Sequence, residues 1–171
     1  MGQATLVGPF SAYQFLSFDE PTPPEKDGAL GEGLQGAFGP LTLRTLSAPD
    51  GRLDLSGEAG DGDVYLLAVD AELPEAGRYV LRAVSSSAHK VLLDGAPVLE
   101  RRSFARTQST VAGRALELSA GTHRLLVKVV REGRAGSVSL SLMRADGAPS
   151  ALRFRPPRRR APRPGPPHRG S

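Results

Sequence analysis

The sequence contains no cysteine and no tryptophan, and it has few other aromatic residues. The lack of cysteine excludes disulfides, cysteine-ligated metal sites and thiol nucleophiles. No apolar stretch approaches the ~18 residues of a membrane-spanning helix. Residues 1–10 lack the basic start and the long apolar run of a signal peptide. We therefore expect a soluble cytoplasmic protein, unless the chain is part of something longer.

Acidic residues are absent from residues 151–171, which contain seven arginines. The other 15 basic residues stand against 18 acidic ones, so residues 1–150 carry a net charge of −3 although the whole chain carries +4. Prolines interleave with the arginines, and like charges repel, so this segment cannot form a packed core. The sequence predicts a domain over 1–150, loop-rich in 1–40, and a disordered tail over 151–171.

Short segments in which apolar and polar residues alternate make up most of residues 41–143. Val64–Leu73 is a mostly apolar run that suits a central strand, and residues 77–84, 124–130 and 137–142 alternate with period two. Asp94-Gly95 predicts a tight hairpin turn, and Pro97 in the returning strand indicates a sheet edge. Six side chains are predicted to share one core: Tyr79, Leu81, Leu125, Val127, Leu140 and Leu142.

Strand signals near the N-terminus are weaker. Leu6 and Val7 before Gly8-Pro9 suggest a short edge strand, and three prolines at 21, 23 and 24 argue against a helix there. No segment shows a capped, helix-spaced apolar pattern. The fold class we expect is all-β, an antiparallel jelly-roll-like β-sandwich.

Residues with catalytic potential are few. His89 and His123 stand at strand starts, where surface positions are expected, and Ser85-Ser86-Ser87 lacks the Gly-x-Ser-x-Gly elbow of a serine hydrolase. No calcium-loop pattern surrounds the aspartates at 61, 63 and 70, and the glycines near residue 33 make no phosphate loop. We therefore expect no enzyme, no cofactor and no metal.

Three segments resemble the protective-antigen-type lectin-like sandwich, over about residues 64–143. These are Pro74 to Arg82, Lys90 to Gly95, and the Ala-Gly-x-His motif that ends at His123. The resemblance extends to the N-terminal regions of large bacterial tetratricopeptide-repeat proteins. It implies strand-end loops that recognise a ligand. The acidic pair that holds calcium in sugar-binding members is missing, since residues 85–88 stand at that position.

The function we expect is a non-catalytic recognition or structural module that binds a glycan or a protein. Such a module could be the N-terminal part of a longer protein. The candidate ligand-binding residues are Ser85, Ser86, Ser87, His89 and Asp94, together with the loops around 57–63 and 100–113. The alternative is charge-driven binding of nucleic acid or another acidic surface through Arg158, Arg159, Arg160 and Arg163. The abrupt change after residue 150 would also fit a frameshift or a misplaced gene end. The ligand and the oligomeric state stay open at this point.

Overall fold

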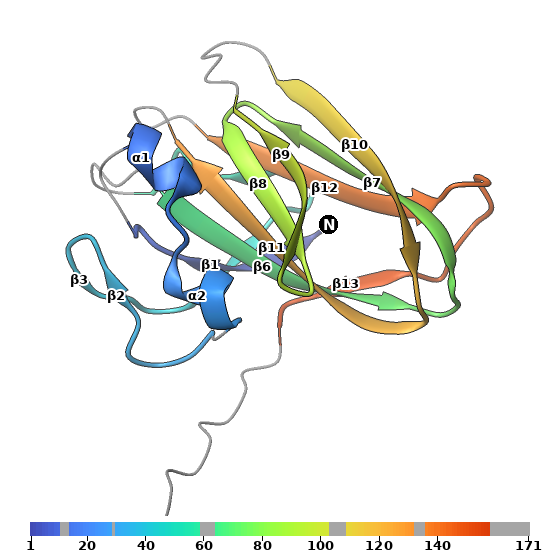
Figure 1. The fold of residues 1–171 in the computed structure, drawn as a ribbon, viewed down its shortest axis with the longest axis horizontal. Helices are drawn as coiled ribbons and strands as arrows, with labels where there is room; N and C mark the ends of the chain where they lie inside the picture. Colours follow the sequence, from blue (N-terminus) through green and yellow to red (C-terminus); the bar gives the residue numbers. More distant parts are fainter. Residues whose placement is uncertain (11–13, 29, 59–63, 103–108, 132–135, 158–171) are drawn as a thin grey trace, which may run out of the picture.

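The computed structural model describes residues 1–10, 14–28, 30–58, 64–102, 109–131 and 136–157. Two antiparallel sheets stack face to face (Figure 1). The seven-stranded sheet has the order β4 (Arg44–Ser47), β1 (Gln3–Val7), β6 (Val64–Leu73), β11 (Gly121–Val130), β8 (Ala88–Leu93), β9 (Ala96–Arg101), and β13 (Arg153–Arg155) also pairs with β6. The four-stranded sheet has the order β10 (Thr110–Leu118), β7 (Gly77–Ser85), β12 (Ser137–Arg144), β5 (Leu53–Asp54). The predicted antiparallel β-sandwich is confirmed.

The core lies between the two sheets, where alternate residues of each strand point inward. In β7 the residues Tyr79, Leu81 and Ala83 are buried, and the residues between them face outward. All six residues predicted to share one core belong to this cluster. The period-two pattern therefore identified both the strands and their buried faces.

Several strand positions also match their sequence signals. β6 lies in the middle of its sheet, as the mostly apolar run predicted. β9, which contains Pro97, lies at an edge. Asp94 and Gly95 connect β8 to β9 with φ angles of 49° and 89°, the left-handed conformations that a two-residue hairpin requires.

The outer face of the seven-stranded sheet is covered by the described residues between 8 and 43 (8–10, 14–28 and 30–43), which we call the cover segment. It contains α1 (Gln14–Asp19), α2 (Pro23–Asp27) and the small hairpin of β2 (Gln35–Gly36) and β3 (Gly39–Pro40). These elements lie on the side of β6, β11 and β8 that faces away from the second sheet (Figure 1). Phe18 and Leu30 pack there against outward-facing strand residues such as Leu66, Leu126 and Val130. The central strands are therefore buried on both faces, which explains their nearly continuous apolar sequence.

Two expectations for the N-terminal region are wrong. The prolines do not prevent a helix, because Pro23 and Pro24 occupy the first helical positions of α2, where the missing N–H needs no partner. Thr22 caps this helix, and its N–H donates to Glu25 Oε2 at 2.6 Å. Leu6 and Val7 do not lie on an edge strand, because β1 pairs with both β4 and β6.

The predicted domain boundary at residue 150 is also too early. β1 pairs with residues 66–68 of β6, and β13 pairs with residues 70–72 of the same strand, with Phe154 opposite Ala71. Leu152 and Phe154 pack against the core. These two apolar side chains stabilise the segment despite its arginines and prolines, so the sandwich extends beyond residue 150. The rest of the predicted tail, from residue 158, lies outside the described residues.

Candidate functional site

The strand ends next to the predicted ligand loops gather at one end of the sandwich. In the strand registers Val130 is paired with both Val64 and Ala88, and Ser85 is paired with Thr110. The segments 59–63 and 103–108, which belong to those loops, lie outside the described residues. The described part of this end is therefore the Ser85–Ser87 turn and the strand termini around it.

The three serines form hydrogen bonds within the fold. Ser85 Oγ lies 2.8 Å from the Ser137 carbonyl oxygen and accepts from the Ser87 N–H at 3.0 Å. Ser86 Oγ accepts from the Ser137 N–H at 3.1 Å. Ser85 and Ser87 are buried, and Ser86 is partly exposed. The serines tie β7 to the start of β12, so of the three only Ser86 reaches the surface.

His89 is fully buried, which contradicts the expected surface position. It lies on the inner side of β8, the side of Val91, because residues of a strand alternate between its faces. Its Nδ1 lies 3.0 Å from the Ser87 carbonyl oxygen, and its Nε2 has no hydrogen-bond partner among the described residues. Burial lowers the pKa of His89, and nearby Arg101 adds to this. The imidazole is therefore a neutral part of the core.

Asp94 and His123 belong to two of the segments that resemble the lectin-like sandwich, and their side chains are in contact in the structure. Asp94 Oδ1 accepts from the Arg124 N–H at 2.8 Å, and Asp94 Oδ2 lies 2.6 Å from His123 Nδ1. His123, which was expected at the surface, is half-buried, with a side chain that is 11% exposed. The predicted turn role of Asp94 is confirmed, and its carboxylate links the β8–β9 turn to β11.

Ser119 completes a Ser-His-Asp arrangement that the sequence analysis did not identify. Its Oγ lies 3.4 Å from His123 Nε2, but its own carbonyl oxygen is closer to that nitrogen, at 2.8 Å. Burial lowers the pKa of His123, but the bonds to Asp94 and to the Ser119 carbonyl outweigh burial and leave the pKa raised. Both ring nitrogens therefore donate, and no lone pair is left to activate the hydroxyl.

Two lysines lie opposite each other beneath the cover segment. Lys128 is paired with Lys90 across β11 and β8, and its side chain is fully buried. Lys128 Nζ donates to the Glu20 carbonyl oxygen at 2.6 Å and to Glu25 Oε2 at 3.1 Å. Burial lowers the pKa of Lys128, and the Glu25 carboxylate opposes that effect. These bonds fasten α2 to the sheet.

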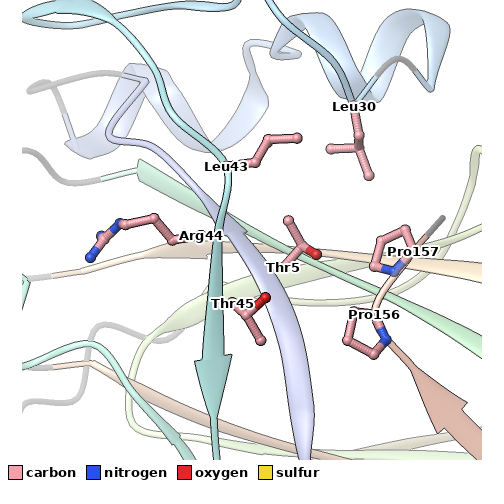
Figure 2. Close-up of a pocket in the computed structure, with 7 residues that line it drawn as sticks. All are labelled: Thr5, Leu30, Leu43, Arg44, Thr45, Pro156 and Pro157. Atoms are coloured by element: carbon pink, nitrogen blue, oxygen red, sulfur yellow. The ribbon is translucent and has the colours of Figure 1, made fainter. Parts of the chain in front are cut away.

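A small open pocket lies at the rim of the cover segment (Figure 2). Its volume is about 120 Å³, and four separate stretches of the chain line it: Thr5, Leu30, Leu43 to Thr45, and Pro156 with Pro157. Thr5 and Thr45 are direct cross-strand partners on β1 and β4. Leu30 comes from the cover segment, and the two prolines follow β13. No sequence motif signalled this pocket, because only strand pairing and the packing of the cover segment bring these stretches together.

The charged residue in the pocket lining, Arg44, is paired within the fold. Arg44 forms an ion pair with Glu58, and its side chain points away from Thr5 and Pro156 (Figure 2). Over the described ranges, no group of three or more His, Asp or Glu side chains is arranged to hold a metal ion. Within those same ranges no helix is long and apolar enough to cross a membrane. Arg158, Arg159, Arg160 and Arg163 are not among the described residues, so their role stays a prediction.

Comparison with known proteins gives structural matches only. No protein-family model matches the sequence, and no curated protein does. The selenomethionine-labelled β-glucosidase from Kluyveromyces marxianus matches with a TM-score of 0.55 at 12% identity, over 82% of this chain and 16% of that chain. The same enzyme in complex with glucose matches with a TM-score of 0.51 at 12% identity, over 84% of this chain and 16% of that chain. A PA14 sugar-binding domain from an RTX adhesin matches with a TM-score of only 0.39 at 16% identity, over 58% of this chain and 56% of that chain.

The chain thus spans about a sixth of the length of the β-glucosidase that it matches. At 12% identity the similarity shows a shared fold alone. The comparisons and the topology together establish an antiparallel β-sandwich.

Proposed function

We propose that this chain is a non-catalytic carbohydrate-binding module and that the pocket at the rim of the cover segment is its sugar site. The observation that carries the proposal is the chemistry of the pocket wall. Thr5 and Thr45 offer hydroxyl groups, and the leucines and prolines offer apolar surface. A pyranose ring presents hydroxyls at its edge and C–H groups on its faces, so it matches both kinds of wall.

The size of the pocket supports a single terminal sugar. About 120 Å³ is well below the ~300–1,000 Å³ of sites that enclose a drug-sized ligand. A shallow site that covers one ring releases little free energy, so we expect a weak interaction with Kd on the order of 1 mM, near −4 kcal/mol. The fold neighbour crystallised with glucose makes glucose the first sugar to test.

The absence of a catalytic role rests on the groups that line the pocket. Glycoside hydrolysis usually needs two carboxylic acids about 5–10 Å apart around the scissile bond. The lining residues include no carboxylate, and the nearby Glu58 is paired with Arg44. We propose binding without hydrolysis and without calcium, since hydroxyls without carboxylates bind a doubly charged ion poorly.

The test is an NMR titration of the full chain with glucose and a panel of methyl glycosides, with and without a calcium chelator. The backbone amide signals of Thr5 and Thr45 are expected to shift, and chelator is expected to change nothing. Thr45→Val removes one hydroxyl at nearly constant shape and should weaken binding several-fold. Thr122→Val is the matched control, because Thr122 is an exposed strand threonine on β11 that does not line the pocket.

Two results would contradict the proposal. One is the lack of any shift at the pocket across the whole panel. The other is sugar binding that chelator abolishes or that Ser86→Ala removes, since both would place the site at the 85–89 turn. The charge-driven alternative depends on arginines outside the described residues, so no structural observation favours it.

A further inference from the structure

The outer face of the four-stranded sheet has an unusual surface. Side chains that point away from the core alternate along its three long strands. They are Arg78, Val80, Arg82 and Val84 on β7, Val111, Gly113, Ala115 and Glu117 on β10, and Ser139, Ser141 and Met143 on β12. We call this set the outer face. It lies on the side of the sandwich opposite the cover segment (Figure 1).

The outer face concentrates exposed apolar surface. Only three large apolar side chains are exposed in the described parts of the chain, and Val111 and Met143, at 55% and 47%, are two of them. The strand registers place Val111 beside Val84, and Met143 beside Val80. Exposed apolar side chains gathered in this way are typical of interaction surfaces, whereas single ones are common anywhere.

Arg82 lies at the centre of these apolar rows. Its cross-strand neighbours are Gly113 on one side and Ser141 on the other, both small and uncharged. Its guanidinium is exposed and has no ion pair or hydrogen bond to any described residue. Arg78, on the same strand, is instead 3.8 Å from Glu117. The face thus presents one uncompensated positive charge surrounded by Val80, Val84 and small residues.

We propose that the outer face docks a protein partner that presents a carboxylate within an apolar patch, with Arg82 as the central contact. Protein interfaces are enriched in arginine and methionine and depleted in lysine, aspartate and glutamate. An arginine ringed by apolar contacts that exclude water is the usual composition of a binding hot spot. Apart from the Arg78–Glu117 pair, the strand residues of this face carry no other charge.

Charge decides among the possible occupants. A second copy packed symmetrically about Arg82 would bring two like charges together, which disfavours a face-to-face dimer. The last fourteen residues of the chain contain arginines and no acid, so the same repulsion disfavours them. A glycan is a poor fit, because the face has no aromatic side chain on which a sugar ring stacks. An acidic partner satisfies Arg82 and covers the apolar rows.

This inference is independent of the sugar proposal. The pocket lies on the outer side of the seven-stranded sheet, and the outer face belongs to the other sheet, so both sites can be occupied together (Figures 1 and 2). A module of this kind would attach a sugar on one side and a protein on the other. Failure of either proposal leaves the other standing, since no residue belongs to both sites.

The test selects short random peptides displayed on phage against the full chain, with counter-selection against Arg82→Glu. Enriched peptides are expected to carry aspartate or glutamate flanked by apolar residues. One such peptide, synthesised with a fluorescent label, should lose at least tenfold in affinity for Arg82→Glu and several-fold for Val111→Ser. Its binding should weaken with salt, and it should shift the methyl NMR signals of Val80, Val84 and Met143.

Arg153→Glu is the control, because it makes the same charge change on an exposed strand residue of the other sheet. It should leave the affinity within about twofold, as expected for a distant rim charge. The proposal is overturned if no acidic peptides are enriched or if Arg82→Glu binds them as well as the natural chain. It is also overturned if Arg82→Glu dissociates a dimer of the chain in sedimentation, or if the sugars of the glycoside panel shift the outer-face methyl signals.

Discussion

Replacement of Lys128 by methionine should destabilise the protein by about 3 kcal/mol. The lysine side chain is fully buried, and its ammonium donates to Glu20 O and Glu25 Oε2. Methionine fills nearly the same volume, so packing changes little and the lost interactions dominate. The substitution leaves the Glu25 carboxylate, whose side chain is only 4% exposed, without its cation.

The magnitude follows from what remains around Glu25. Removal of one partner of a buried ion pair lowers the free energy of unfolding by about 3–5 kcal/mol, because the other charge stays buried without a partner. Glu25 keeps its hydrogen bonds from the Thr22 N–H and hydroxyl, at 2.6 and 2.8 Å, so the lower end of that range applies. Glu25→Gln should destabilise the protein less, by about 1–2 kcal/mol, since the amide oxygen of glutamine still accepts from Thr22 and Lys128.

The assay is urea unfolding followed by circular dichroism, for the natural chain, both single variants and the double variant. The double variant contains neither charge, so its loss should be smaller than the sum of the single losses by about 1–3 kcal/mol. Total stabilities of about 5–15 kcal/mol leave all four proteins folded enough to measure. A loss below about 0.5 kcal/mol for Lys128→Met, the usual scale of surface substitutions, would refute the argument.

Three further outcomes are expected. Val127→Ala should lower the free energy of unfolding by about 1–3 kcal/mol, since Val127 is fully buried, and a change below about 0.3 kcal/mol would mean that its face is misassigned. A chain ending at residue 150 should melt at a lower temperature than one ending at 157, because it lacks Phe154 and the β13 pairing; equal melting would show that β13 adds nothing. His123→Gln should lower the free energy of unfolding more at pH 6 than at pH 9. The pKa of His123 is higher in the folded protein than the unfolded value of about 6.5, so protonated His123 stabilises the fold fully below that value. This stabilisation is lost as the pH rises through the pKa of the folded protein. A pH-independent difference between the two proteins would contradict this assignment.

The local pattern was most informative where one strand face is buried. In residues 77–84 and 137–142 the alternation identified the strands and their inward residues, because a period of two leaves no other arrangement of a half-buried strand. Asp94-Gly95 predicted its hairpin from backbone sterics alone. These features depend on neighbouring residues and elementary geometry, so one sequence is enough to find them.

The sequence reasoning failed where distant contacts outweighed local composition. β13 lies in an arginine- and proline-rich stretch, but the free edge of β6 and the packing of Phe154 hold it in place. His89 was expected on the surface because it starts a strand, yet its position on the inner side of β8 buries it. Neither the free edge nor the facing sheet can be read from the residues next to them.

The class of the fold, most of its strands and its core could be predicted from the residues alone, since alternation and turn chemistry are local properties. Tertiary structure decided everything that concerns the candidate sites. The pocket joins Thr5, Thr45 and Pro156, and the outer face places Gly113 and Ser141 beside Arg82. Strand order and register created both groupings, because they set which remote segments become neighbours, and no local pattern encodes that choice.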